Sequence, residues 1–356
     1  MRETNSWQRA RIAVIGVGGA GGNAVDHMIQ VGIADVDFIA ANTDLQALAR
    51  CEAPRKIVLG GGMTRSLGAG GDPCVGAEAA QRSRQEIGEA LQGVDLVFVA
   101  AGMGGGTGTG AAPVIAEIAQ AADALTIAIV SEPFAFEGSR RAAVAAEGIA
   151  RLKERVDALI VVPNERLLEM VGRRVPLDVA FRVADEALRQ AVQGISELVT
   201  RPGLINLDFA DVRSLLRGAG QAFISVGYGE GPQKAVEAAH TALRNPLLDG
   251  RIIDRAERLL VNITGGEDLT LNEVGQALEV ISSAVTPGAE VLFGAVIDGA
   301  MEGRAEITLI ITGFVPAAQQ KVEEPAITDP AWQDLSIPAF LRMRRQTLIL
   351  EGLNVG

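Results

Sequence analysis

The chain has few of the residue types on which several common kinds of site depend. Aromatic residues make up 4% of its 356 residues, and it has two cysteines and two histidines. Such a low aromatic content argues against a stacking surface for single-stranded nucleic acid. Cys51 and Cys74 form no CxxC pair, so neither a disulfide framework nor a zinc site is indicated. His27 and His240 stand alone in the sequence, which argues against a metal centre or a catalytic triad.

An excess of basic charge and long apolar runs are also missing. The net charge is −12 and the pI is ≈ 4.8, which argues against nonspecific binding to DNA, RNA or anionic lipid. No apolar run approaches the roughly 18–20 residues that span a bilayer, and residues 1–11 lack the apolar core of a signal peptide. We therefore expect a cytoplasmic protein without nucleic-acid partners or direct membrane insertion.

Glycine, in contrast, is abundant, and one glycine-rich stretch gives the main indication of a binding site. Residues 102–110, GMGGGTGTG, follow an apolar run at 94–101 that predicts a buried strand, and precede a predicted helix at 111–120. Glycines let successive backbone N–H groups surround an anion, and a helix N-terminus adds partial positive charge. Thr107 and Thr109 offer hydroxyls to phosphate oxygens or a magnesium ion. The stretch predicts a phosphate-binding loop, but it lacks the Lys-Ser or Lys-Thr of a P-loop.

A second glycine loop follows the predicted strand near the N-terminus, within residues 11–23. Three of its glycines fit the GxGxxG dinucleotide fingerprint: Gly16, Gly18 and Gly21. The next predicted strand, 36–41, leads to Asn42 and Asp44, and a carboxylate at this distance also suits the ribose of NAD. A NAD-dependent oxidoreductase is therefore an alternative. Two phosphate loops, however, favour a compact nucleoside triphosphate enclosed from both sides.

Three further segments are ambiguous from their chemistry alone. Residues 60–76 are glycine-rich and predict either a long mobile loop or a binding segment. Glu137 and Arg141 lie one helical turn apart, as an ordinary surface ion pair would. Phe181 and Asp185 share a face of a helix predicted over 176–200, whose apolar residues keep a 3–4 spacing. This helix would be roughly 36 Å long and could connect two domains.

Asn206, Asp208 and Asp211 are interleaved with apolar residues after this helix. Such a trio suits the positioning and polarisation of a water molecule during phosphoryl transfer. An N-capped helix with Asp208 as the cap explains the same residues equally simply. From residue 221 to residue 314 the pattern changes to that of an α+β domain, without another phosphate signature.

These motifs together resemble those of the tubulin/FtsZ family, especially its bacterial cell-division branch. The resemblance is carried by the glycine-threonine loop at 102–110, FEGxxR at 136–141, NxDFAD at 206–211 and IPAFL at 337–341. It covers about residues 10–315 and 334–345. The fold that it implies is α/β, with a Rossmann-like GTPase domain joined by a long central helix to a smaller α+β domain. The implied divisions are 1–175 for the GTP-binding domain, 176–203 for the helix, 204–315 for the second domain, 316–333 for a linker and 334–356 for a partner-binding peptide and tail.

The resemblance also implies roles for individual residues. Gly19 to Asn23 would approach the phosphates and sugar, residues 42–44 and 60–76 would lie near the γ-phosphate, Glu137 would bind a ribose hydroxyl and Arg141 a phosphate. Phe181 would stack on guanine and Asp185, where several relatives have Asn, would accept its N1–H and N2–H hydrogen bonds. The full set of expected nucleotide-binding residues is Gly18, Gly19, Ala20, Gly21, Gly22, Asn23, Asn42, Asp44, Gly104, Gly105, Gly106, Thr107, Gly108, Thr109, Gly110, Glu137, Arg141, Asn164, Phe181 and Asp185.

The function that the resemblance implies is that of a polymerising cytoskeletal GTPase with GTP/GDP and Mg²⁺ as cofactors. Subunits would stack head to tail, and Asn206, Asp208 and Asp211 of one subunit would complete hydrolysis in the next. Residues 334–345 would bind membrane-tethering division proteins such as FtsA, at the division ring on the inner face of the membrane. No protein-only metal site is predicted. A GTP-binding scaffold that does not hydrolyse GTP is the second alternative.

Overall fold

The computed structural model describes residues 10–63, 65–171, 175–200, 203–205, 207–248, 253 and 255–314. Asn206, the linker predicted at 316–333 and the peptide and tail predicted at 334–356 therefore lie outside the described residues. Within the described residues no helix is both long enough and apolar enough to cross a membrane.

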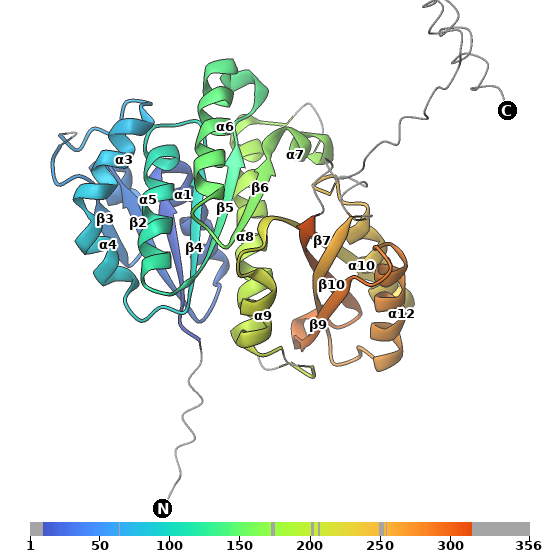
Figure 1. Ribbon diagram of the computed structural model, residues 1–356. Coiled ribbons are helices and arrows are strands. Elements are labelled where there is room, and N and C mark those ends of the chain that lie inside the picture. The colour runs from blue at the N-terminus through green and yellow to red at the C-terminus, as the bar shows by residue number, and fades with distance from the viewer. Residues whose placement is uncertain are drawn as a thin grey trace, which may run out of the picture. The chain divides into compact units, whose positions relative to one another are not determined.

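The strands of the described residues form one ten-stranded sheet in the order β3-β2-β1-β4-β5-β6-β7-β10-β8-β9 (Figure 1). The pairs from β3 to β7 are parallel, whereas β10 runs antiparallel to both β7 and β8. The strands are β1 Ile12–Val17, β2 Val36–Asn42, β3 Arg55–Val58, β4 Leu96–Gly102, β5 Leu125–Glu132, β6 Ala158–Pro163, β7 Gly220–Glu230, β8 Ala256–Gly265, β9 Glu290–Ile297 and β10 Arg304–Phe314.

Helices cover both faces of the parallel part of the sheet, so its strands are buried on both sides. Val14 and Phe98 pack with Met28 of α1 on one face, whereas Ile15 and Val99, their neighbours in sequence, pack on the other. The helices are α1 Gly18–Val31, α2 Leu45–Arg50, α3 Pro73–Arg82, α4 Arg84–Leu91, α5 Thr107–Ala121, α6 Ser139–Lys153, α7 Asn164–Val171, α8 Leu177–Thr200, α9 Phe209–Leu216, α10 Lys234–Leu243 and α12 Leu271–Ser283.

The helix α8 connects the two halves of the fold, as predicted. Its buried residues Leu188 and Val192 belong to the same core as Val14 of β1 and as Leu260 and Ile310 of the C-terminal strands. Strand β7 joins the halves as well, because residues 220–222 pair with β6 and residues 223–230 pair with β10. The α/β fold with a long central helix is therefore confirmed, while the domain boundaries proposed above stay predictions.

Two predicted helices begin earlier than expected. The segments 18–23 and 107–110, both predicted as loops, form the first turns of α1 and α5. Pro113, expected in a first turn, consequently lies inside α5. Glycine has a low helix propensity, but Gly18, Gly21, Gly108 and Gly110 pack closely against neighbouring backbone, and this tertiary packing outweighs the propensity.

Candidate functional site

The two glycine loops lie side by side at the carboxyl ends of the neighbouring parallel strands β1 and β4. A β-carbon on Gly18 would lie 3.0 Å from the amide nitrogen of Gly108, and one on Gly102 would lie 2.6 Å from the β-carbon of Ala20. The helices α1 and α5 thus start next to each other, each with first-turn N–H groups that have no partner inside the helix. The two loops together form one surface whose backbone N–H groups are suited to an anion.

The glycines of the first loop divide into two groups. A β-carbon on Gly16 or Gly21 would collide with backbone, that of Gly21 with the carbonyl oxygen of Ala100. A β-carbon on Gly19 or Gly22 would meet nothing within 4 Å. The first pair therefore allows α1 to approach the sheet, and the second pair leaves space for a ligand.

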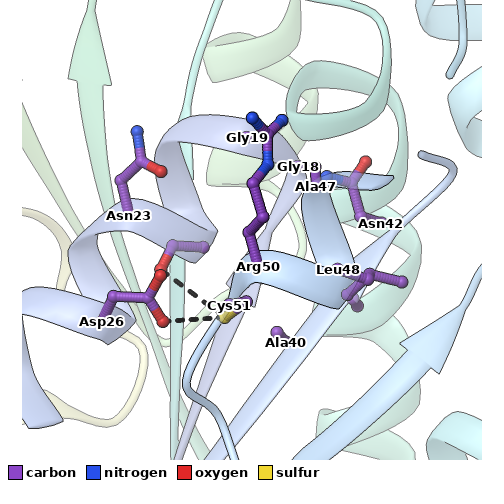
Figure 2. Close-up of a pocket in the computed structure, with 12 residues that line it drawn as sticks. Gly18, Gly19, Asn23, Asp26, Ala40, Asn42, Ala47, Leu48, Arg50 and Cys51 are labelled. Carbon is purple, nitrogen blue, oxygen red and sulfur yellow. Dashed lines mark hydrogen bonds between the residues drawn. The ribbon is translucent and has the colours of Figure 1, made fainter. Parts of the chain in front are cut away.

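A cavity of ≈ 340 Å³ adjoins this open side of α1 (Figure 2). It lies between α1, the end of β2 and α2. Its lining consists of Gly18, Gly19, Gly22, Asn23, Asp26, Ala40, Ala41, Asn42, Ala47, Leu48, Arg50 and Cys51. Gly18, Gly19, Gly22, Asn23 and Asn42 among these were predicted to bind the nucleotide.

The threonines of the second loop contribute mainly to its shape. The Thr107 hydroxyl lies 2.6 Å from the Thr43 hydroxyl. The Thr109 side chain is buried, and its Oγ1 accepts a hydrogen bond of 2.8 Å from the Gly104 amide. The Thr109 hydroxyl, expected to face a phosphate or magnesium, thus fixes the loop that contains it.

Two glycines of this loop are packing positions. Gly106 and Gly110 lie against the backbone of Asp72 and Pro73, at the start of α3. The amide of Gly68 donates to the carbonyl of Thr43 over 3.2 Å. The described part of segment 60–76 thus contacts both the 42–44 segment and the second loop, the region in which a binding segment was predicted.

Asn42 and Asp44 are placed differently from each other. Asn42 is buried at the end of β2, and its Oδ1 accepts a hydrogen bond from the Asp44 amide at 3.2 Å. The Asp44 carboxylate caps α2 by accepting from the amides of Gln46 and Ala47 at 2.8 and 3.2 Å. One carboxylate oxygen of Asp44 therefore has a structural partner already.

Glu137 and Arg141 form the predicted ion pair, 2.9 Å between Oε2 and Nη1. Glu137 also accepts from the Phe134 amide at 2.8 Å. A β-carbon on Gly104, whose φ is +97°, would lie 2.7 Å from Cγ of Arg141, so the arginine lies directly on the second loop. The pair is thus part of the site and not an isolated surface contact.

Phe181 and Asp185 of α8 lie on the far side of the site from α2. The Phe181 ring is 41% exposed and meets Phe134 edge to face, with 5.5 Å between ring centroids. Burial raises the pKa of Asp185 to about 6, and His27 of α1 offsets this only in part. An exposed ring and a half-buried carboxylate on one helical face are suitable for a planar base with two N–H donors.

Asn164, the first residue of α7, carries a second indication of a ligand. Its side chain is 5% exposed, and its Oδ1 has no hydrogen-bond partner. A buried acceptor without a partner is costly and calls for an explanation. Asn164 follows β6 directly, and the next residue, Glu165, accepts from the Ala135 amide at 2.9 Å, so it adjoins the Phe134–Glu137 segment.

Helix α9, which has Asp208 at its N-cap and Asp211 in its first turn, lies at the other end of the sheet (Figure 1). Arg213 of α9 and Arg217, which follows this helix, bind Asp123, just before β5 begins, with 3.0 and 3.1 Å between Nη2 and Oδ1. The Gly220 amide donates to Asp157, just before β6, at 2.9 Å. The structure thus brings the predicted nucleotide residues together at the carboxyl ends of the strands and places Asp208 and Asp211 near the amino ends.

Sequence reasoning missed the three residues with ionisable side chains in the cavity lining, Asp26, Arg50 and Cys51. Asp26 Oδ1 accepts from Cys51 Sγ at 2.9 Å and from the Glu52 amide at 2.6 Å. Burial raises the pKa of the Cys51 thiol to about 11, and the hydrogen bond to Asp26 adds to this effect. No motif marks these residues, because they meet only through the packing of α2 against α1.

Comparisons with known proteins agree with this geometry. Residues 11–172 match the GTPase domain of the tubulin/FtsZ family, and residues 220–315 match the C-terminal domain of the FtsZ family. An empty FtsZ dimer from M. jannaschii is similar at 46% identity with a TM-score of 0.82, over 86% of this chain and 89% of that one. A GTPγS-bound CetZ2 protofilament from Haloferax volcanii is 24% identical with a TM-score of 0.73, over 86% and 93%, which is a likeness of fold alone.

Proposed function

We propose that this chain, which belongs to the tubulin/FtsZ family and is a GTPase, assembles into a head-to-tail polymer. GTP would be hydrolysed at sites shared between adjacent subunits. GTP would bind at the paired glycine loops, and the Asp208–Asp211 segment of the adjacent subunit would complete the hydrolytic site. The family match leaves the oxidoreductase alternative without support, and the GTPase domain favours hydrolysis over a scaffold that only binds GTP.

The observation that carries this proposal is the distance between the two parts of the site. Strand β5 has eight residues, so its two ends are roughly 23 Å apart. The glycine loops lie beyond the carboxyl end and α9 is attached at the amino end, through Asp123. Asp208 and Asp211 are therefore too far away to act on a nucleotide in the same molecule. Head-to-tail stacking would bring the two ends of successive subunits together.

The surroundings of Asp208 support a catalytic role over a capping role. Asp208 stands at the N-cap position of α9, but its side chain makes no capping hydrogen bond. Both Asp208 and Asp211 are exposed on the first turn of the helix. Two exposed carboxylates are suited to orient and polarise a water molecule for attack on the γ-phosphate. Asn206 would belong to the same group, but it lies outside the described residues.

The nucleotide would lie with its phosphates on the N-termini of α1 and α5 and beside Arg141, and with its ribose near Glu137. Guanine would stack on Phe181 and donate to Asp185, and Asn164 Oδ1 would accept from the sugar or base. Mg²⁺ would enter with the phosphates, which usually supply several of its ligands. The described residues contain no group of three or more His, Cys, Asp or Glu side chains that could hold a metal ion.

The cellular role that we propose is a cytoplasmic division ring on the inner face of the membrane. It is supported by the FtsZ relative and by the match to the FtsZ C-terminal domain. Recruitment would proceed through residues 334–345 and a membrane-tethering division protein such as FtsA; these residues lie outside the described part of the chain.

The test is the rate of GTP hydrolysis per subunit as a function of protein concentration in Mg²⁺ buffer. A site shared between subunits predicts almost no activity below a threshold concentration and a steep rise above it. A constant rate per subunit down to the most dilute sample would mean that each monomer contains a complete site, and the trans assignment of Asp208 and Asp211 would be wrong.

A further inference from the structure

Arg50 is the last residue of α2 and lines the cavity beside the first glycine loop. Of the described residues that line this cavity, it is the only one with a positive charge. Figure 2 shows its side chain extended away from Asp26 and toward the start of α1, where Gly18 and Gly19 are labelled. The cation therefore lies at the open side of the loop.

Within the described part of the chain, no carboxylate forms an ion pair with this cation. Asp26 is the only carboxylate in the lining, and its Oδ1 is used by the Cys51 thiol and the Glu52 amide. Among the described residues, no ion pair or side-chain hydrogen bond involves Arg50. An arginine without a partner beside a phosphate loop is available to a ligand.

The backbone at Arg50 is fixed. Leu48 is 3% exposed, and Cys51 and Glu52 are both held by Asp26 of α1. The base of the Arg50 side chain is thus anchored to the helix that starts at the glycine loop. The guanidinium can turn toward a ligand in the cavity without a change in the backbone, because only the side chain has to move.

We propose that Arg50 binds the polyphosphate of the nucleotide and is a phosphate-binding residue of the GTPase site in addition to Arg141. The inference depends on the placement of the nucleotide in the proposed function. A guanidinium forms paired, charge-assisted hydrogen bonds with phosphate oxygens. Arg141 lies on the second glycine loop and Arg50 adjoins the first, so one arginine would stand at each loop.

The test compares GTPγS, GDP and guanosine binding to the Arg50→Ala protein, at protein concentrations below the assembly threshold. The loss of one charge-assisted contact predicts roughly 5- to 20-fold weaker binding of GTPγS and GDP. Binding of guanosine, which has no phosphate, is expected to be unchanged. Arg50→Lys should restore part of the affinity, because it keeps the charge. Arg55→Ala removes an exposed arginine of β3 outside the cavity and should change none of the three values.

Two outcomes would overturn the proposal. Equal losses for guanosine and GTPγS would mean that the substitution distorts the site as a whole. Unchanged binding of all three ligands would mean that Arg50 does not touch the phosphates. The result does not depend on polymerisation, because binding is measured on single subunits. A failure of the trans-hydrolysis proposal would therefore leave this result interpretable.

Discussion

Gly18 and Gly108 approach so closely that a β-carbon on the first would lie 3.0 Å from the amide nitrogen of the second. Gly18 is the first residue of α1 and Gly108 is the second residue of α5. The positive ends of two helices are thus directed at one region, which is suited to the several charges of a polyphosphate. A side chain at Gly18 would push the two loops apart, and one at Gly108 would collide with the carbonyl oxygen of Gly102 at 2.5 Å.

Substitutions in the first loop should separate ligand binding from folding. Gly19→Ala places a methyl group in open space beside the cavity, so thermal stability should be unchanged or slightly higher, given the better helix propensity of alanine. GTPγS affinity should fall about tenfold, because the methyl group keeps a phosphate from the backbone amides. Isothermal calorimetry and thermal unfolding measure the two effects.

Gly21→Ala is the matched comparison, because its β-carbon would collide with the carbonyl oxygen of Ala100. It should lower the free energy of unfolding by about 1–3 kcal/mol, as overpacking does. If Gly19→Ala also lost stability, or if Gly21→Ala unfolded normally, the division into cavity and packing glycines would be wrong.

Long periodic segments were readily predicted from the sequence. The central helix expected over 176–200 is observed at Leu177–Thr200, and the strands predicted at 36–41 and 94–101 are observed as β2 and β4. The helical stretch that leads to β4 is divided into α3 and α4 at Ser83, whose hydroxyl accepts from the Gly60 amide at 3.0 Å. That contact joins residues far apart in the chain, so local periodicity contains no sign of it.

The candidate site was predictable where a motif repeats the family pattern. The two glycine loops contact each other, and Arg141 lies on the second loop. Arg50, in contrast, belongs to a six-residue helix that is too short to show a periodic pattern in the sequence. For Asp44 the sequence motif indicates a ligand-binding residue, but it does not reveal that the carboxylate also caps α2. In both cases packing around a short helix decides what the side chain contacts.

Asp211→Ala should suppress hydrolysis without loss of nucleotide binding. Its carboxylate lies far from the glycine loops, so the affinity of single subunits for GTPγS should stay within about twofold, while turnover in assembled protein should fall roughly 100-fold or more. Filaments of mixed wild-type and variant subunits should hydrolyse at a rate that falls with the variant fraction. Glu279→Ala removes an exposed acid of α12 and should leave the rate unchanged. A parallel loss of GTPγS binding would contradict the trans role.

Asp185 should make recognition of guanine dependent on pH. Its pKa is raised to about 6 by burial, and only the ionised form accepts two N–H donors from the base. Binding should therefore weaken below about pH 6, and binding near pH 6 should release a proton. Guanosine is the appropriate ligand because it has no phosphate that titrates in this range. Calorimetry in buffers of different ionisation enthalpy would measure the released proton.

Asp185→Asn should remove this pH dependence and the proton release, because an amide does not titrate. Glu306→Gln is a suitable control, since burial also raises the pKa of Glu306, which lies on β10 in the C-terminal half. If guanosine binding to the wild-type protein were equally strong at pH 5 and pH 7.5, Asp185 would not be the group that accepts from guanine.

Asn164 and Asn262 form a matched pair for a final prediction, because each has a buried Oδ1 without a hydrogen-bond partner. Replacing either by leucine removes an unsatisfied acceptor, so each variant should be as stable as the wild type or more stable by about 1 kcal/mol. The effects on nucleotide should differ. Asn164 adjoins the proposed sugar and base position, so Asn164→Leu should reduce the rise in melting temperature that GTPγS causes. Asn262 lies on β8 of the C-terminal half, so Asn262→Leu should keep the full rise. An undiminished rise in the Asn164 variant would show that its acceptor serves no nucleotide.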